Sequence, residues 1–136
     1  MIRRTSRELV VQSLFQIDFS GCSAEEALNA AVEEQNSKKA LKAQNYAQIA
    51  LNGILNSLAE IDAKISEFSI DWEVNRMPAV DRNILRLAVY EIYFAEEKIP
   101  AGIAINEAVE IAKIYGSEDS PRFINGLLGK MVRNNE

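Results

Sequence analysis

The 136-residue sequence contains no histidine, one cysteine, three prolines and six glycines. Without histidine, the chain cannot form a histidine-based catalytic triad, cannot use an imidazole as a general base and lacks the commonest ligand of catalytic metal sites. The single cysteine, Cys22, excludes an internal disulfide bond and any zinc site that needs two or more cysteines. Because proline and glycine interrupt helices and are scarce here, we expect long helices.

The sequence also lacks long hydrophobic runs, since no uninterrupted apolar segment exceeds four residues. The stretch from Arg3 to Cys22 loosely resembles a lipoprotein signal, but Glu8 and Asp18 interrupt its apolar part. A signal sequence needs about 7–15 continuous apolar residues, and a membrane span needs about twenty. We therefore predict a cytoplasmic protein without a membrane segment, in which Cys22 is reduced.

Charge is unevenly distributed along the chain. Fifteen lysines and arginines against twenty acidic residues give a net charge of −5, a balance that by itself argues against a nucleic-acid-binding protein. However, residues 8–37 carry six acidic residues and neither lysine nor arginine, whereas Arg3, Arg4 and Arg7 come directly before them. The arginines at one end create a local field that differs from the average of the protein.

Apolar residues recur every three or four positions along most of the chain, and no segment shows the two-residue alternation of a strand. The pattern therefore predicts an all-α protein. The expected helices cover residues 6–19, 24–32, 37–68, 80–94, 103–115 and 120–132. The sequence leaves open whether the long third segment is continuous or broken near Gly53. The segment 80–94 is apolar nearly all round, which places it in the centre of the fold.

Several of these helices have capping signals at their ends. Ser23 and Glu26 can form a capping box at the start of the second helix. Ser120 followed by Pro121 is the clearest helix start, because an N-cap serine precedes a proline in the first turn. Gly21 is expected to end the first helix, Asn36 and Ser37 are candidate caps for the start of the third, and Gly116 is expected to end the fifth.

Three glutamates are the strongest candidates for catalytic or metal-binding chemistry. Glu107 and Glu110 share a helix face, and Glu91 lies within the apolar stripe of the central segment. A di-metal carboxylate centre normally adds histidine to such glutamates, so we interpret Glu107 and Glu110 as solvated. Glu91 is then an inward carboxylate paired with an arginine or with backbone amides. The sequence also has no glycine-rich nucleotide-binding loop, and we expect neither an enzyme nor a metal or cofactor.

Arg3, Arg4 and Arg7 stand at the start of the first helix, where cations oppose the helix dipole. One interpretation is a frayed, solvated tail. The other is an arm that grips phosphates, because arginine offers two parallel donors to a phosphate group.

The turn 116–123 also has two interpretations. The helix that follows it presents free amides and the positive end of a dipole, which suits an anion or a base edge, and Phe123 could stack on an exposed base. Alternatively, Ser120 only caps the helix and Phe123 anchors the core. The same choice between core packing and base stacking applies to Phe15 and Tyr115.

Three blocks of the sequence stand out together. The first is Arg3-Arg4-Thr5-Ser6-Arg7-Glu8 with Gln12-Ser13-Leu14-Phe15, and the second runs from Val80 to Glu91. The third runs from Ala104 to Lys113 and continues through Gly116, Asp119-Ser120 and Phe123-Ile124-Asn125-Gly126. These blocks resemble the NusB family of transcription antitermination factors, span nearly the whole chain and occur in the order of the family.

The resemblance implies one domain over residues 1–136, with six to seven helices in two fused three-helix sub-bundles. These sub-bundles would cover residues 1–72 and 73–136. Members of the family are non-enzymatic adaptors that bind the single-stranded boxA element of nascent ribosomal RNA. They do so together with NusE, a ribosomal small-subunit protein, and help the RNA polymerase antitermination complex to resist termination.

The resemblance also implies which residues bind. The RNA-binding residues would be Arg3, Arg4, Arg7, Gln12, Phe15, Asp119, Ser120 and Phe123. The NusE-binding residues would be Asn75, Asp81 and Arg82. We expect the first and last helices to pack side by side, so that the arginines and the start of the last helix form one basic groove. The alternatives are a helical protein-binding module without RNA binding and the accessory domain of an RNA methyltransferase.

Overall fold

The computed structural model describes residues 4–70 and 72–134, and these residues are helical with short connections. The helices are α1 (Arg4–Ser20), α2 (Ala24–Gln35), α3 (Lys38–Asn56), α4 (Leu58–Phe68), α5 (Ala79–Val89), α6 (Ala101–Tyr115) and α7 (Ser120–Asn134), with a 3-10 turn η1 (Val74–Arg76) and a π-helical turn η2 (Tyr90–Phe94). The all-α prediction is confirmed. Arg3 lies outside the described residues.

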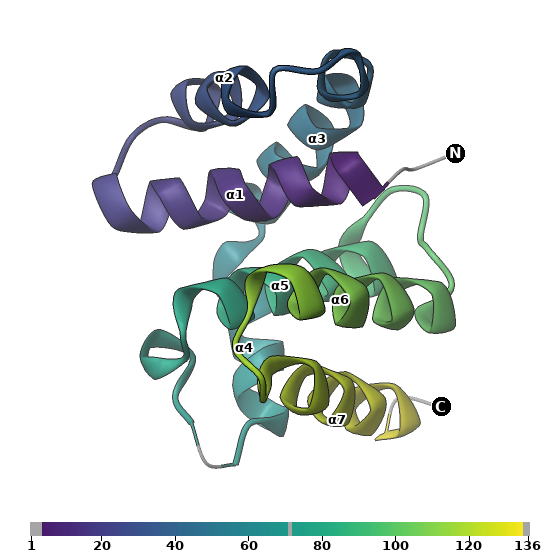
Figure 1. Ribbon diagram of the computed structural model, residues 1–136. Helices are drawn as coiled ribbons and strands as arrows, with labels where there is room; N and C mark the ends of the chain where they lie inside the picture. The colour runs from purple at the N-terminus through teal and green to yellow at the C-terminus, as the bar shows by residue number, and fades with distance from the viewer. Residues whose placement is uncertain (1–3, 71, 135–136) are drawn as a thin grey trace.

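The helices form two groups that meet at α5 (Figure 1). Helices α1, α2 and α3 pack against one another, and α5, α6 and α7 form the second group. Helix α5 contacts α1 and α3 on one side and α6 and α7 on the other. Helix α4 packs on α5 and α7 in addition to α3. Helix α4 thus contacts both groups, and the expected sub-bundle boundary near residue 72 stays a prediction.

Helix α5 is buried along almost its whole length, as its apolar sequence predicted. Ile84, Leu85 and Val89 are each at most 1% exposed. The helix does not continue regularly to residue 94, because the Ala95 N–H donates to the Tyr90 carbonyl at 2.8 Å in a π-helical turn. The central position of the segment is confirmed, and the regular geometry of its last turn is not.

The capping box at the start of α2 and the Ser37 cap at the start of α3 are confirmed, whereas Asn36 belongs to the end of α2 rather than to the start of α3. The Glu26 N–H donates to Ser23 Oγ at 3.1 Å, and the Ser23 N–H donates to the Glu26 carboxylate at 3.2 Å. Asn36 ends α2 in the left-handed conformation, with φ 45°. Ser37 Oγ then accepts from the Ala40 N–H at 3.0 Å and starts α3. These local hydrogen bonds depend on residues at most four positions apart, which is why the sequence alone predicted them.

Two other helix ends differ from the prediction. The long third segment is broken, but at Ser57 rather than at Gly53. At the start of α7, the Phe123 N–H donates to the Asp119 carbonyl at 3.1 Å. Asp119 therefore occupies the N-cap position, and Ser120 is already inside the helix. Gly116 ends α6 in an extended conformation, and a Cβ there would lie 2.5 Å from the Ser120 side chain.

Candidate functional site

Arg4, in the first turn of α1, forms a two-point ion pair with Glu107 of α6. Its Nε and Nη2 atoms donate to the two Glu107 carboxylate oxygens at 3.1 and 2.9 Å. These hydrogen bonds hold the pKa of Glu107 below its usual range and raise the pKa of Arg4. The carboxylate offsets the unfavourable dipole interaction at this helix start. Arg4 therefore belongs to the folded helix rather than to a frayed tail, although its side chain is 43% exposed.

Arg7, one turn further along α1, is buried. Its Nε atom donates to both Glu91 carboxylate oxygens at 3.0 and 3.1 Å, and its Nη1 atom lies 3.6 Å from Glu107 Oε1. The inward Glu91 paired with an arginine is confirmed. The expectation of a solvated Glu107 is wrong, because the Glu107 side chain is 17% exposed and contacts both arginines. We call Arg4, Arg7, Glu91 and Glu107 the α1–α6 cluster.

Tyr46 of α3 completes the surroundings of Glu91. Its hydroxyl donates to Glu91 Oε2 at 2.8 Å. Burial of the phenol, together with the negative charge of Glu91, raises the pKa of Tyr46. Side chains of three helices therefore meet at this interior carboxylate, which joins the two groups of helices.

Further along α1, Gln12 and Phe15 face Tyr115, the last residue of α6. Gln12 Nε2 donates to the Tyr115 hydroxyl at 3.4 Å, and that hydroxyl donates to Glu8 at 3.2 Å. Burial, followed by the charge of Glu8, raises the pKa of Tyr115. Phe15 and Tyr115 are 40% and 37% exposed. They flank a mostly apolar cavity of about 320 Å³ that Val80 of α5 also lines.

The turn before α7 lies beside a second cavity. Ser120 Oγ donates to Asp81 Oδ1 at 2.6 Å and accepts from the Ser117 N–H at 2.9 Å. Ser120 and Asp81 are only 1% and 5% exposed, so they lie behind the surface. Phe123 is half-buried and packs on the core while lining the cavity. The cavity, of about 400 Å³, is lined by Trp72, Pro78, Asp81, Ser117, Asp119 and Phe123.

Helices α1 and α7 do not lie side by side in the described part of the chain, because α5 and α6 lie between them (Figure 1). The expectation of one basic groove between the first and last helices is therefore wrong. The candidate residues are instead linked through α5, whose consecutive residues Val80 and Asp81 line the first and second cavities. We use the name recognition strip for Arg4 and for the exposed or half-buried candidate residues beside these two cavities. It consists of Arg4, Gln12, Phe15, Tyr115, Asp119 and Phe123.

The residues expected to bind a protein partner divide between two sides of α5. Asn75 is exposed on η1, and Arg82 Nη1 donates to the Val74, Asn75 and Met77 carbonyls at 3.3–3.4 Å. Asn75 and Arg82 also line one shallow cavity of about 620 Å³. The structure thus brings Asn75 and Arg82 together. It places Asp81 on the other side, beside α7.

Arg82 belongs to a second ionic network. Arg82 Nη2 donates to Asp18 at 2.9 Å, and Arg86 donates through Nε and Nη2 to Asp62 at 2.8 Å each. Burial acts to raise the pKa of Asp18, but hydrogen bonds from Asn83 and Arg82 hold it below its usual range. We call Asp18, Asp62, Arg82 and Arg86 the α5 cluster.

Sequence reasoning missed several residues of these sites. The sequence did not identify Tyr46, Asp62 or Arg86 as site residues, because each has its partner on a different helix. A signal was nevertheless present for Arg86, since an arginine inside a helix that is apolar nearly all round needs a buried partner. Trp72 was not singled out either, yet it lines the cavity beside Phe123.

No group of three or more histidine, cysteine, aspartate or glutamate side chains is arranged to hold a metal ion among residues 4–70 and 72–134. Over the same residues, no helix combines the length and the apolar character needed to cross a bilayer.

Two groups of helices joined through a buried central helix, with ionic clusters at their junction, define an all-α bundle protein. The NusB family model matches residues 4–133, and the chain belongs to the NusB family. The transcription antitermination protein NusB of Pelotomaculum thermopropionicum is 47% identical over 136 residues, which cover 100% of this chain and 92% of that protein.

Solved structures agree with this assignment. The structure of T. maritima NusB is 40% identical in sequence and covers 98% of this chain and 92% of its own, with a TM-score of 0.84. A structure of the antitermination factors NusB and NusE in complex with dsRNA matches with a TM-score of 0.83 and 28% identity. That match covers 98% of this chain and 97% of the other. The fold is therefore that of NusB over nearly the whole chain.

Proposed function

We propose that this protein is a transcription antitermination adaptor that binds the boxA element of nascent ribosomal RNA together with NusE. It contributes binding surfaces to the RNA polymerase antitermination complex and is not an enzyme. Membership of the NusB family supports this function, as does the similarity to a NusB that was solved with NusE and RNA. We place the protein in the cytoplasm, where bacterial RNA is made.

The observation that carries the proposal is the recognition strip. Phe15 and Tyr115 expose part of their rings beside one cavity, and Phe123 lines the next. Bases of single-stranded RNA stack on such rings regardless of sequence, at about 1–3 kcal/mol per base. Gln12 Oε1 is buried and has no hydrogen-bond partner among the described residues. We infer that RNA binding reorients this side chain and gives the oxygen a donor.

The arginines contribute unequally in this proposal. Arg4 is the exposed member of the α1–α6 cluster and can bind a phosphate. Arg7 is buried against Glu91, so it acts by holding the start of α1 in place. Because Arg4 already pairs with Glu107, electrostatic attraction contributes only modestly to RNA affinity. The logarithm of that affinity should fall with the logarithm of salt concentration, with a slope of about −0.7 for each phosphate contact.

NusE supplies the second surface. Asn75 lies on the connector of residues 73–78 that leads into α5, and Arg82 lies in the first turn of α5. Together they form the NusE-binding surface of this proposal. Asp81 supports that surface indirectly by fixing the start of α7 through Ser120. Two proteins on one RNA gain avidity, which explains why a small acidic protein would bind boxA with a partner.

The proposal is tested by titrating a labelled single-stranded boxA RNA with the protein, alone and with NusE, at low salt. We expect weak binding alone and clearly tighter binding with NusE. Phe15→Ala should weaken RNA binding while leaving NusE binding intact, and Leu41→Ala is the control, because Leu41 is 65% exposed on α3 outside the strip. Absence of RNA binding in both titrations, with intact NusE binding, would support a purely protein-binding module instead.

A further inference from the structure

The cavity beside Phe15 is lined by a charged residue that the proposed RNA contacts leave unused, Glu34 in the last turn of α2. Its side chain is exposed, and its carboxylate forms no hydrogen bond or ion pair with another described residue. Three lysines follow α2 at the start of α3, but neither lysine nor arginine is among the described residues that line this cavity. Because a carboxylate repels phosphate groups, the cavity does not suit the RNA backbone.

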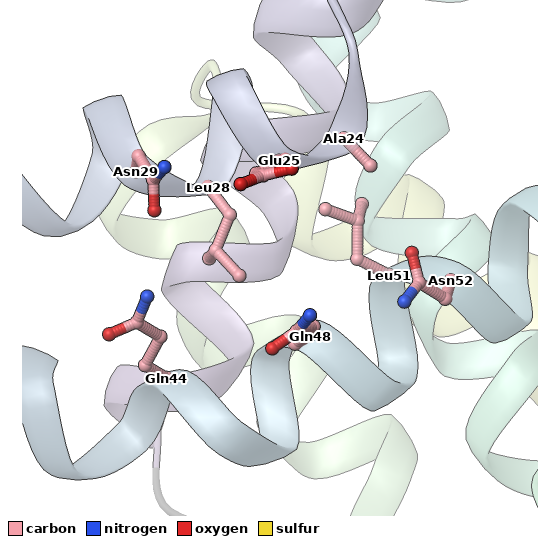
Figure 2. A pocket seen from close by; sticks show the side chains of 8 residues that line it. All are labelled: Ala24, Glu25, Leu28, Asn29, Gln44, Gln48, Leu51 and Asn52. Atoms are coloured by element: carbon pink, nitrogen blue, oxygen red, sulfur yellow. The ribbon is translucent and has the colours of Figure 1, made fainter.

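Helix α2 also contributes a glutamate to a different surface. Glu25, in its first turn, lines a groove together with Gln44 and Gln48 of α3 (Figure 2). A side-chain amide offers donors and an acceptor together, so that groove favours no single kind of ligand. The cavity beside Phe15 differs from it, because there the donor groups are already used.

The hydrogen bonds around the cavity beside Phe15 leave oxygen atoms without donors. Gln12 Nε2 donates to the Tyr115 hydroxyl at 3.4 Å, and that hydroxyl donates to Glu8 at 3.2 Å. Gln16 Nε2 donates to a serine one turn later on α1 at 3.3 Å. Among the described residues, the groups that remain unpartnered are Gln12 Oε1, Gln16 Oε1 and the Glu34 carboxylate. The cavity therefore presents hydrogen-bond acceptors to a ligand.

The walls of the cavity indicate the shape of that ligand. Phe15 and Tyr115 expose parts of their rings, and Val11 and Val80 add apolar surface. A nucleobase has flat faces that pack on such walls and an edge that carries N–H groups. A basic side chain of a partner protein would satisfy Glu34 but would cover less of the apolar wall. The combination thus favours a base.

We propose that this cavity, within the RNA-binding surface of the proposed function, selects guanine at one position of the RNA. The Watson–Crick edge of guanine carries two adjacent donors, the N1 imino and N2 amino groups, whereas adenine, cytosine and uracil each carry one donor group there. The two oxygens of the Glu34 carboxylate match these two donors, as they match the two parallel donors of an arginine. Glu34 is then a specificity-determining residue, and the rings of Phe15 and Tyr115 hold the base in the cavity.

The test uses boxA RNAs in which one position at a time carries guanine, inosine, adenine, cytosine or uracil. Affinity is measured by fluorescence anisotropy with NusE present. At one position guanine should bind about tenfold more tightly than inosine, which lacks the N2 amino group, because a two-point contact to a base discriminates by roughly this factor or more. Glu34→Gln should remove this difference and favour adenine, which pairs with a glutamine amide. Glu33→Gln is the matched control, since Glu33 is an exposed neighbour on α2 that does not line the cavity.

Failure of guanine selection and failure of the proposed function give different results. RNA binding without a guanine-selective position, or a guanine preference that Glu34→Gln leaves unchanged, would overturn guanine selection while boxA binding stands. Weaker NusE binding by Glu34→Gln in the absence of RNA would also overturn it, because the cavity would then hold a basic side chain of the partner. Absence of RNA binding by the wild type, even with NusE, would overturn both proposals.

Discussion

The α1–α6 cluster and the α5 cluster both pair two arginines with two carboxylates, but they distribute exposure differently. In the α1–α6 cluster, the arginine side chains are 43% and 4% exposed, and both contact the shared Glu107. In the α5 cluster, they are 14% and 9% exposed, and both contact Asp18. The first cluster thus joins a buried support to an accessible cation. In the α5 cluster both guanidinium groups are partly enclosed, and that of Arg82 also donates hydrogen bonds to the connector.

The largest effect that would test this comparison is the loss of Arg7. Arg7→Ala leaves the Glu91 carboxylate, which is 1% exposed, without its arginine partner. Removing one member of a buried pair costs about 3–5 kcal/mol, and we expect that loss in the free energy of unfolding measured with urea. Arg4→Ala is the control and should cost less than about 1 kcal/mol, as exposed pairs do. If both variants lost the same free energy of unfolding, Arg7 would not be a buried structural support that differs from the accessible Arg4.

A smaller effect is expected from Arg82→Ala in the α5 cluster. The variant removes hydrogen bonds to Asp18 and to three carbonyls of the connector, and hydrogen bonds to charged groups contribute about 1.5–3 kcal/mol. The connector should loosen, so NusE binding measured by calorimetry should weaken more than RNA binding by the protein alone. Arg76→Ala is a control on the same connector, because Arg76 makes an exposed pair with Glu73. If Arg82→Ala leaves the NusE affinity unchanged, the α5 cluster does not support the NusE-binding surface.

Acid sensitivity should distinguish the clusters through their carboxylates. Folding lowers the pKa of Glu107, through its hydrogen bond from Arg4, and that of Asp18. A carboxylate with a lowered pKa stabilises the fold above its unfolded pKa, and this contribution is lost as the pH falls through the folded value. Stability should therefore decline below about pH 4.3, the unfolded value for glutamate. In urea unfolding from pH 7 to 3, Glu107→Gln and Asp18→Asn should each reduce this decline, with the Asp18 contribution beginning to be lost only below about pH 3.9, the unfolded value for aspartate.

The smallest expected effect concerns salt. Arg4→Gln should reduce the slope of the logarithm of RNA affinity against the logarithm of salt concentration by about 0.7, the value of one phosphate contact on a single strand. RNA titrations at several salt concentrations measure this slope. Lys39→Gln, at an exposed position of α3 outside the strip, should leave it unchanged. If Arg4→Gln leaves this slope unchanged, Arg4 does not contact a phosphate of the RNA.

The features predicted correctly from the sequence are those that depend on near neighbours or on burial alone. The capping box of Ser23 and Glu26 lies within one turn. The interior pairing of Glu91 followed from a carboxylate in an apolar stripe. The sequence did not predict that Arg7 rather than another arginine would pair with it, because these residues are 84 positions apart and meet only through packing.

The errors have the same origin. Ser120 was expected to cap α7, but the hydrogen bond from its hydroxyl goes to Asp81, 39 positions earlier. The position of α7 relative to α1 depends on two intervening helices that no short motif encodes. A local pattern predicts where a helix begins, whereas the choice of its neighbours depends on how apolar faces from distant segments fit together.

The first turn of α5 has a consequence for cooperativity. Val80, Asp81 and Arg82 follow one another along the chain, and because successive residues project about 100° apart around a helix, they reach three different surroundings. A displacement of this single turn would be transmitted to the Phe15 cavity, to the start of α7 and to the connector together. If NusE raises the affinity of the protein for RNA through this turn, thermodynamic reciprocity requires RNA to raise the affinity for NusE by the same factor.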